Sequence, residues 1–179
     1  LDPTKPEAGV NAIFAQFNQY MPNANALGAS RHNDFGYPSV MMFTDANGYD
    51  MVSEDNGYNW VGNNLDFSDR SNTSRETQII WNDLYAIIYT ANNVIAPIDP
   101  ETEDPQNQFY LAQGLAARAF SYFNLAQLFQ FNYVGNESKL CVPLITNENS
   151  NQAALDGAPR ATVGEVYDLI VADINKAVE

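Results

Sequence analysis

The sequence predicts an all-α fold of stacked helices, and two observations support this prediction. First, the pattern T-x-x-E stands directly before three apolar runs with helical spacing, at Thr4–Glu7, Thr73–Glu76 and Thr162–Glu165. In such a capping box the Thr side chain accepts a hydrogen bond from the third helical residue, and the Glu reaches back to the Thr amide. Second, residues 110–131 are apolar on nearly every face except at Arg118, which is typical of a helix enclosed by neighbours.

We expect helices over residues 6–21, 76–96, 106–129 and 163–179. Prolines mark their boundaries, because proline is accepted in the first turn of a helix and cannot continue its interior. Pro6 lies in the first turn of the first helix, and Pro22 and Pro97 directly follow the first and second helices. The last three helices are expected to pack against one another, with Phe120 and Ile170 among the buried residues.

The segment of residues 21–72 differs from the rest of the chain. It is rich in Asn, Gly, Asp and Ser, yet it carries spaced aromatic residues: Phe35, Tyr37, Phe43, Tyr49, Tyr58, Trp60 and Phe67. Connections of this length are uncommon in compact domains and are usually functional or disordered, and the aromatic content argues against disorder. We therefore expect an ordered, irregular layer over the helices, with a short helix over residues 39–45.

The composition limits the classes of partner. The 179 residues carry a net charge of −14, which disfavours nucleic acid and anionic membrane surfaces because both attract Lys and Arg. Charged residues make up only 17% of the chain, and much of its polarity comes instead from amides, including 22 asparagines. This composition suits a neutral, hydroxyl-rich ligand.

The cysteine and histidine content limits the chemistry. With one cysteine, Cys141, and one histidine, His32, the chain has no internal disulfide bond and cannot supply the four N or S ligands of a structural zinc site. A catalytic Cys–His pair is formally possible, but no local signature surrounds either residue, and Cys141 is expected to be a small buried apolar residue. No apolar stretch reaches the ~18 residues of a membrane-spanning helix. Because the chain starts at Leu1 and not at Met, we expect a processed or trimmed product.

Two motifs suggest a degenerate tetratricopeptide-like repeat, with W-x-x-L at Trp81–Leu84 and A-x-x-x-F at Ala116–Phe120. The distance between the two motifs exceeds the consensus spacing of such repeats. The chain therefore predicts tetratricopeptide-like helix pairs and not a regular array.

Four stretches in order resemble a known family. They are W-x-x-x-Y-x-x-I-x-x-x-N-x-x-I over residues 81–95, AARAFSYFNL over 116–125, VPL over 142–144 and PRATVGEVYDLIVADINKA over 159–177. Together they resemble the SusD/RagB-like proteins. The chain departs from the family at residues 130–132, where a glycine commonly follows the aromatic residue, and we expect a different turn there.

The resemblance implies a fold and a function. SusD-like proteins are lipoproteins on the outer face of the outer membrane in Bacteroidetes, where they bind glycans, or in some members peptides. They form a lid on a SusC-like TonB-dependent transporter, and they are neither enzymes nor cofactor-dependent. Their tetratricopeptide-like helix pairs pack against an irregular, ligand-binding remainder, and the lipid-bearing cysteine of their mature start is absent from this chain.

The resemblance also implies a domain organisation. Residues 1–179 are expected to form the amino-terminal helical domain of a longer protein, with residues 21–72 as the irregular layer and 73–179 as the helix array. The final helix has a full apolar stripe and no glycine C-cap, so we expect truncation after it and weaker hydrogen-exchange protection there than in the two preceding helices.

The candidate ligand-binding residues lie in the irregular segment. A sugar ring stacks its C–H face on an aromatic side chain, and its hydroxyl groups hydrogen-bond to amides and carboxylates. Tyr58 and Trp60 supply rings, and Asp50 and Asn63 supply polar groups close in sequence. The competing interpretation is that Trp60 anchors the loop to the helices.

Two other groups have structural interpretations. Arg118 needs a partner because a buried unpaired charge is costly, and Asp173 is the first candidate. The helix-borne aromatic residues are expected to pack in the core: Trp81, Tyr85, Tyr122 and Tyr167. The run from Asp45 to Asp50 is similar to the start of a calcium loop but departs from EF-hand spacing, so a plain turn at Asn47 is favoured and no metal site is predicted.

The sequence therefore favours a glycan-binding, transporter-associated surface lipoprotein. The alternative is a helical-repeat scaffold that binds only protein. A glycoside hydrolase would need two carboxylates flanking the bound sugar, and no motif places such a pair.

Overall fold

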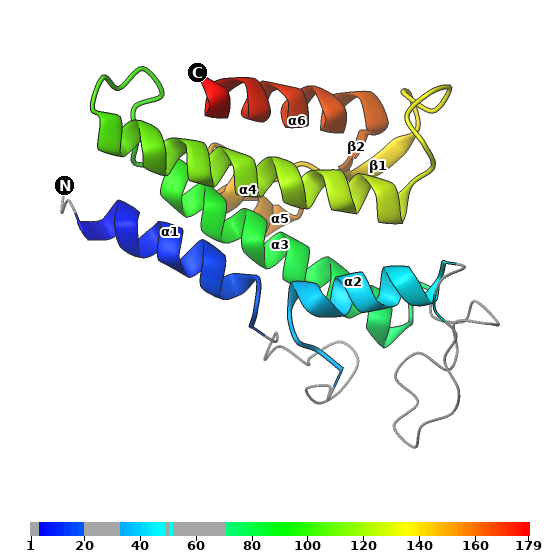
Figure 1. Ribbon diagram of the computed structural model, residues 1–179. Coiled ribbons are helices and arrows are strands. Elements are labelled where there is room, and N and C mark those ends of the chain that lie inside the picture. Colours follow the sequence, from blue (N-terminus) through cyan, green and yellow to red (C-terminus); the bar gives the residue numbers. More distant parts are fainter. Residues whose placement is uncertain (1–3, 20–32, 49–50, 52–70) are drawn as a thin grey trace. The chain divides into compact units, whose positions relative to one another are not determined.

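The computed structural model describes residues 4–19, 33–48, 51 and 71–179, and the side chains from Pro6 onward within these ranges (Figure 1). Its elements are α1 (Thr4–Gln16), α2 (Tyr37–Ala46), α3 (Arg75–Ile95), α4 (Pro105–Phe129), β1 (Leu140–Pro143), α5 (Ser150–Asp156), β2 (Arg160–Thr162) and α6 (Val163–Val178). The predicted all-α class is confirmed. The chain divides into two compact units, a larger one of residues 1–14 and 84–179 and a smaller one of residues 15–83.

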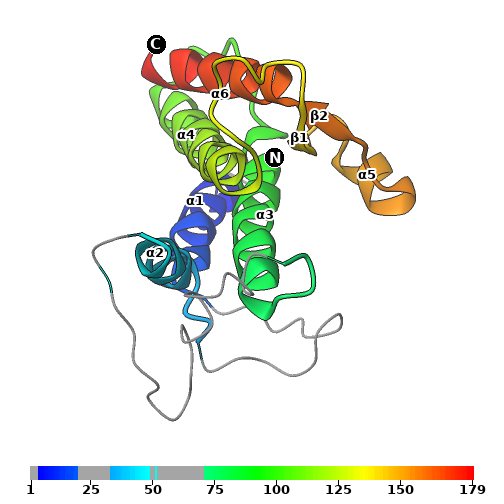
Figure 2. The same cartoon turned by 90° about the vertical axis from the view of Figure 1, so that its right-hand side faces the viewer.

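Helix α4 is the centre of the larger unit. It lies between α6 on one side and the Leu84–Ile95 part of α3 on the other (Figures 1 and 2). Gly114 makes the close approach to α3 possible, because a Cβ atom there would lie 2.9 Å from the Ile95 side chain. A small residue at a helix contact lets the two backbones approach, so α4 packs against α3 at this point and against α6 on its other side.

The core of the larger unit is made by the apolar stripes of these helices. Its fully buried side chains come from α1, α3, α4, β1 and α6 and include Ile13, Leu84, Ile87, Ile88, Val94, Tyr122, Leu125, Val142, Val163 and Val166. Burial of apolar surface contributes about 25 cal/mol to the free energy of folding for each Å² removed from water. The array is therefore held chiefly by apolar packing.

The predicted core position of Phe120 is wrong, whereas that of Ile170 is confirmed. Ile170 is 8% exposed, but Phe120 is 39% exposed. At 100° per residue, the directions of Phe120 and Tyr122 around the axis of α4 differ by about 160°, and Tyr122 is fully buried. The apolar stripe of Phe120 and Phe123 thus lies at the edge of the core, where both side chains are partly covered.

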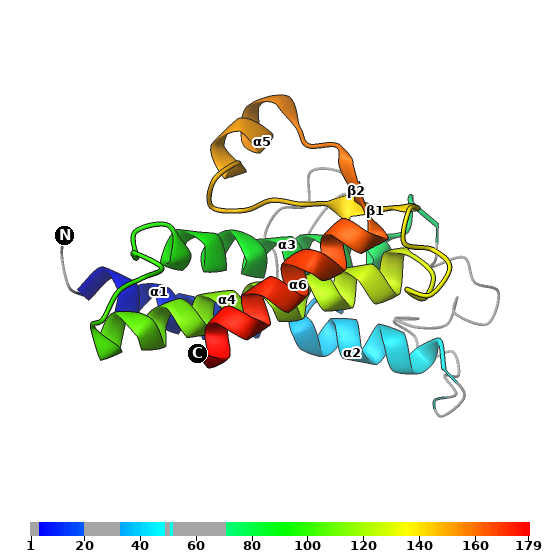
Figure 3. The ribbon, with the colours of Figure 1, turned by 90° about the horizontal axis from the view of Figure 1, so that it is seen from above.

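The connection between α4 and α6 contains two short antiparallel strands, β1 and β2. Strand β1 pairs with β2, with Leu140 opposite Thr162 and Pro143 opposite Arg160, and with an irregularity between these pairs. The Arg160 guanidinium donates from Nε to the Cys141 carbonyl at 2.5 Å and from NH2 to the Leu140 carbonyl at 2.6 Å. The intervening helix α5 buries none of its residues and stands apart from α4 and α6 (Figure 3).

The smaller unit packs α2 against the first part of α3. Phe43 and Ile79 form its buried core, and four partly buried residues pack on them: Met42, Ala46, Met51 and Ile80. Gly36 precedes α2 with φ +76°, and a Cβ atom there would lie 2.6 Å from the Phe17 carbonyl oxygen. The short helix expected over residues 39–45 is confirmed and extends slightly further at both ends.

The first helix is shorter than predicted, because α1 ends at Gln16 and not at residue 21. The Phe17 carbonyl accepts a hydrogen bond from the Tyr37 amide at 2.8 Å. That carbonyl is therefore used by the turn before α2 instead of by the next turn of α1.

The three capping patterns have different outcomes. Thr162 and Glu165 form the predicted capping box at α6. At α3 the prediction is wrong by one residue, since the Ser74 hydroxyl, and not Thr73, accepts from the Glu76 amide at 3.2 Å. Helix α1 already includes Thr4, whose side chain lies outside the described residues. In the part of the chain that the structure describes, no helix is both long and apolar enough to cross a membrane.

Candidate functional site

The four predicted ligand-binding residues, Asp50, Tyr58, Trp60 and Asn63, lie outside the described residues. They stay predictions, and the structure assigns them no geometry. In the larger unit the structure describes a polar interior and two surface clefts.

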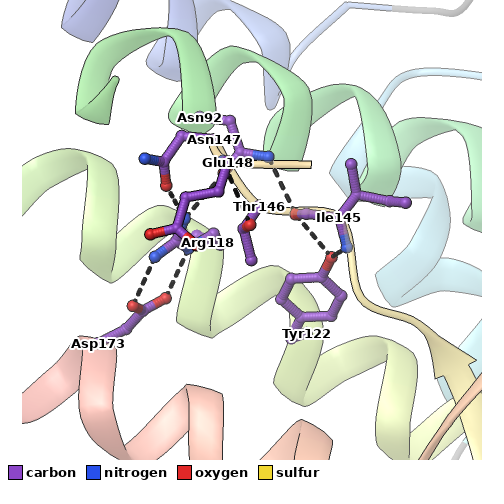
Figure 4. Close-up of polar contacts among 8 residues, drawn as sticks. All are labelled: Asn92, Arg118, Tyr122, Ile145, Thr146, Asn147, Glu148 and Asp173. Atoms are coloured by element: carbon purple, nitrogen blue, oxygen red, sulfur yellow. Dashed lines mark hydrogen bonds and ion pairs between the residues drawn. The ribbon is translucent and has the colours of Figure 1, made fainter. Parts of the chain in front are cut away.

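A buried polar cluster surrounds Arg118 on α4 (Figure 4). Its Nε and NH2 atoms donate to the two carboxylate oxygens of Asp173 on α6, each at 2.7 Å. Its NH1 atom donates to the side-chain oxygens of Asn92 on α3 at 2.9 Å and of Asn147 at 3.0 Å. Asp173 is thus the partner that the sequence suggested for Arg118. One guanidinium connects α3, α4, α6 and the segment after β1.

The same cluster fixes the backbone at Ile145, just after β1. The Tyr122 hydroxyl donates to the Ile145 carbonyl at 3.0 Å and accepts from the Ile145 amide at 2.6 Å. The Asn92 amide group also donates to the Ile145 carbonyl at 2.9 Å. Tyr85 donates to the Pro143 carbonyl at 2.7 Å. Side chains of α3 and α4 therefore hydrogen-bond both backbone groups of Ile145 (Figure 4).

Burial controls the electrostatics of this cluster. It raises the pKa of Tyr122 to about 12, although the Ile145 hydrogen bond and the Arg118 charge act in the opposite direction. Burial also raises the pKa of Tyr85, with smaller contributions from Tyr122 and Cys141. Both phenols therefore stay neutral and keep donating at physiological pH. Tyr122 is fully buried, as predicted for the core, whereas the other three predicted core aromatic residues are only partly buried: Trp81, Tyr85 and Tyr167.

This arrangement positions the backbone and offers little to a ligand. Arg118 is 5% exposed and Asp173 is 4% exposed. Each branch of the guanidinium already donates to an oxygen, so a bound anion would have to displace an existing contact. The sequence did not predict the part that Asn92 and Asn147 play. The available signal was Asn92, an amide in an otherwise apolar stripe, because a buried amide needs hydrogen-bond partners.

Cys141 fits its predicted role as a small buried residue. It is 1% exposed on β1, and burial raises the pKa of its thiol. A neutral thiol is a poor nucleophile, so the geometry gives no support to a catalytic Cys–His pair. His32 lies outside the described residues.

The predicted turn at Asn47 is observed at the end of α2. Its Nδ2 atom donates to the Phe43 carbonyl at 2.7 Å, and the Gly48 amide donates to the Asp45 carbonyl at 2.9 Å. Across the described ranges, no group of three or more His, Cys, Asp or Glu side chains is placed to hold a metal ion.

Two surface clefts of the larger unit share the exposed ring of Phe109, which is 57% exposed on α4. The first, of about 500 Å³, is lined by Glu7, Val10, Asn11, Pro105, Gln106, Phe109 and Tyr110. The second, of about 620 Å³, is lined mainly by residues 100–112 and the end of α6. Both volumes fall in the range of small-molecule sites, and sequence reasoning did not indicate either cleft.

The amino-acid sequence matches one protein family over residues 7–179. That family is described as SusD-like and as starch-binding, associating with the outer membrane. No curated protein matches the chain.

Solved structures of SusD-like proteins have a similar fold. A SusD-like carbohydrate-binding protein from Bacteroides vulgatus matches with a TM-score of 0.77 and 22% identity, over 97% of this chain and 34% of that one. A SusD superfamily protein from Bacteroides fragilis gives 0.70 and 23%, over 97% and 38%. Another from Bacteroides thetaiotaomicron gives 0.62 and 21%, over 97% and 36%.

These identities show a common fold, and the chain spans little more than a third of the length of each neighbour. The family match covers nearly the whole chain, including all four stretches whose sequence resembles the family. The chain therefore belongs to the SusD-like family.

Proposed function

We propose that this chain is part of a glycan-binding outer-membrane lipoprotein that captures oligosaccharides for a SusC-like TonB-dependent transporter. The observation that carries the proposal is the match over residues 7–179 to a family described as starch-binding and associating with the outer membrane. The composition agrees with a neutral ligand, since the chain combines a net charge of −14 with 22 asparagines. Membrane attachment in this proposal comes from a lipid on a segment outside residues 1–179.

The described structure suits a structural role for α3, α4 and α6, with ligand binding elsewhere in the protein. The Arg118 cluster has its donors committed and is nearly closed to solvent. Ligand contacts are therefore expected from the aromatic and amide-rich segment between α2 and α3. Trp60 and Tyr58 supply stacking surfaces there, and Asp50 and Asn63 supply hydrogen bonds to hydroxyl groups. No step of this function requires a catalytic residue or a cofactor.

Affinity electrophoresis of the full-length protein against a panel of neutral polysaccharides tests the proposal. At least one polysaccharide should retard the protein, and Trp60→Ala should weaken that binding by about tenfold or more, as expected for an aromatic anchor. Tyr89→Ala is the matched control, because Tyr89 is 61% exposed on α3 outside this segment and should leave retardation unchanged. Retention of full affinity in Trp60→Ala would assign Trp60 to loop packing.

A second experiment separates the alternatives. A tagged full-length protein purified from outer membranes should bring down a TonB-dependent transporter. Absence of retardation by the whole panel, with a protein partner recovered, would support the helical-repeat scaffold. Release of reducing sugar by the pure protein would instead identify a hydrolase and overturn the proposal.

A further inference from the structure

The smaller unit contains a buried carboxyl group that accepts no hydrogen bond from an N–H donor of the described residues. Asp83 on α3 is 0% exposed, and neither of its side-chain oxygens has a hydrogen-bond partner as long as the group is ionised. An ionised carboxylate in this position would lose its hydration and gain nothing in return. Such a group normally takes up a proton instead.

A second buried carboxyl group lies beside it. Asp34, in the turn before α2, is 7% exposed. Burial raises the pKa of Asp83 to about 8, and the charge of Asp34 and a hydrogen bond between the two carboxyl groups, which needs a proton on one of them, act in the same direction. Asp34 is the titratable group, among those in the described residues, whose charge acts on Asp83.

A hydrogen bond places the turn of Asp34 against α3 independently. The Asn33 amide group donates to Glu76 at 3.2 Å. Glu76 and Asp83 are seven residues apart on α3 and therefore lie on the same face of that helix. Neighbouring residues of the turn thus reach two positions along one helix face. Glu76 is the other carboxylate of this face, and it also accepts from the Ser74 hydroxyl at 3.0 Å.

The turn itself has a fixed conformation. The Asp34 Oδ1 atom accepts from the Gly36 amide at 3.1 Å. The Ser39 hydroxyl donates to the Asn33 carbonyl at 2.7 Å and accepts from the Phe35 amide at 2.6 Å. Gly36 adopts a positive φ that few other residues tolerate. Asp34 is thus held in place by its own turn and cannot swing away from Asp83 cheaply.

We infer that Asp34 and Asp83 form a proton-binding pair, in which one shared proton joins the turn before α2 to α3. Asp83 carries the proton, and its O–H group donates a hydrogen bond to the Asp34 carboxylate. Loss of this proton places two negative charges in one buried space, and the turn and α2 then separate from α3 so that water reaches both groups. The pair is a pH-sensitive latch within the smaller unit, and it does not depend on the proposed ligand.

Infrared spectroscopy of the protein labelled with carboxyl-¹³C aspartate tests the shared proton directly. At about pH 7 the wild-type spectrum should contain the C=O band of a protonated carboxylic acid, because the buried pair retains its proton there. Asp83→Asn should abolish this band. Asp45→Asn should retain it, since Asp45 is an exposed carboxylate of α2 that does not belong to the pair. A wild-type spectrum without the acid band at neutral pH would overturn the inference, whether or not the variants fold.

Amide hydrogen exchange tests the latch. After correction for intrinsic exchange rates, protection of residues 37–46 should fall about tenfold per pH unit between about pH 5 and pH 7, because opening releases one proton. Protection of α4 and α6 should not follow this slope. Asp83→Asn should remove the pH dependence of protection in residues 37–46. If Asp83→Asn folds poorly, Asp34→Asn supplies the same test. A slope equal in wild type and in the variant would contradict the latch.

Discussion

Arg118 on α4 and Asp173 on α6 form a buried ion pair joined at two points, with Nε–Oδ2 and NH2–Oδ1 distances of 2.7 Å. The two residues are 55 positions apart in the sequence. The planar guanidinium matches the carboxylate, and such two-point pairs are the stronger class of ion pair. The pair fixes how α6 lies along α4, and the remaining donor of Arg118 reaches Asn92 and Asn147.

Asp173→Asn should therefore destabilise the chain strongly. It leaves the Arg118 charge buried without a counterion, and breaking a buried pair in this way costs about 3–5 kcal/mol. Urea unfolding monitored by circular dichroism measures the loss. Lys176→Gln is the control, because Lys176 pairs with Glu101 and Glu179 at the surface, and exposed pairs contribute little. An equal change in both variants would mean that the Arg118 pair is not a stabilising contact.

Tyr122→Phe should loosen the segment after β1. The substitution removes two hydrogen bonds to Ile145 and leaves its amide without the partner seen here. The expected cost is about 1–3 kcal/mol, the usual range for an unsatisfied buried group. Exchange of the Ile145 amide should accelerate at the same time. Tyr89→Phe, at an exposed position of α3, should change neither quantity.

Two substitutions on α4 should separate its buried side from its exposed side. Leu125 is fully buried, so Leu125→Ala should cost about 2–5 kcal/mol in urea unfolding. Phe120→Ala should cost less than half as much, although it removes more atoms, because Phe120 is 39% exposed. Equal losses of unfolding free energy in the two variants would mean that Phe120 is a core residue after all.

The free energy of unfolding should depend on the protonation of Asp83. Its native pKa of about 8 lies above the ordinary value of 3.8, so the native state holds a proton that the unfolded chain releases. This contribution is fully present below about pH 4 and is lost as the pH rises to about 8, by at most ~1.4 kcal/mol per pH unit. Asp83→Asn should remove that slope from the pH profile of urea unfolding, and Asp45→Asn should keep it. A profile that rises with pH through this range in both variants and wild type would contradict the assignment.

The Cys141 thiol should react slowly with Ellman's reagent in the native protein. It is 1% exposed, and burial disfavours its thiolate. Reaction should be at least about a thousandfold slower than in urea, because it requires local opening. Leu155→Cys supplies the control, since this position on α5 is 82% exposed and should give a fast additional phase. Rapid native labelling of Cys141 would show that β1 opens readily.

The sequence alone determined the three longest helices and the family resemblance. Apolar spacing and proline positions located α3, α4 and α6 to within a few residues, since both act through local backbone geometry. The Arg118–Asp173 pair was also accessible from the sequence. A lone charge in an apolar helix requires an opposite charge nearby, and α6 offered one on its own stripe.

Only the tertiary structure decided which apolar stripe of α4 is buried. Tyr122 and Phe120 have similar hydrophobic character, and the direction from which α3 and α6 approach makes one a core residue and leaves the other exposed. The hydrogen bonds from Asn92 and Tyr122 to Ile145 likewise join segments distant in sequence, so no local pattern reveals them. The pairing of Asp34 with Asp83 has the same cause, because a carboxyl group's protonation depends on neighbours that only folding brings together.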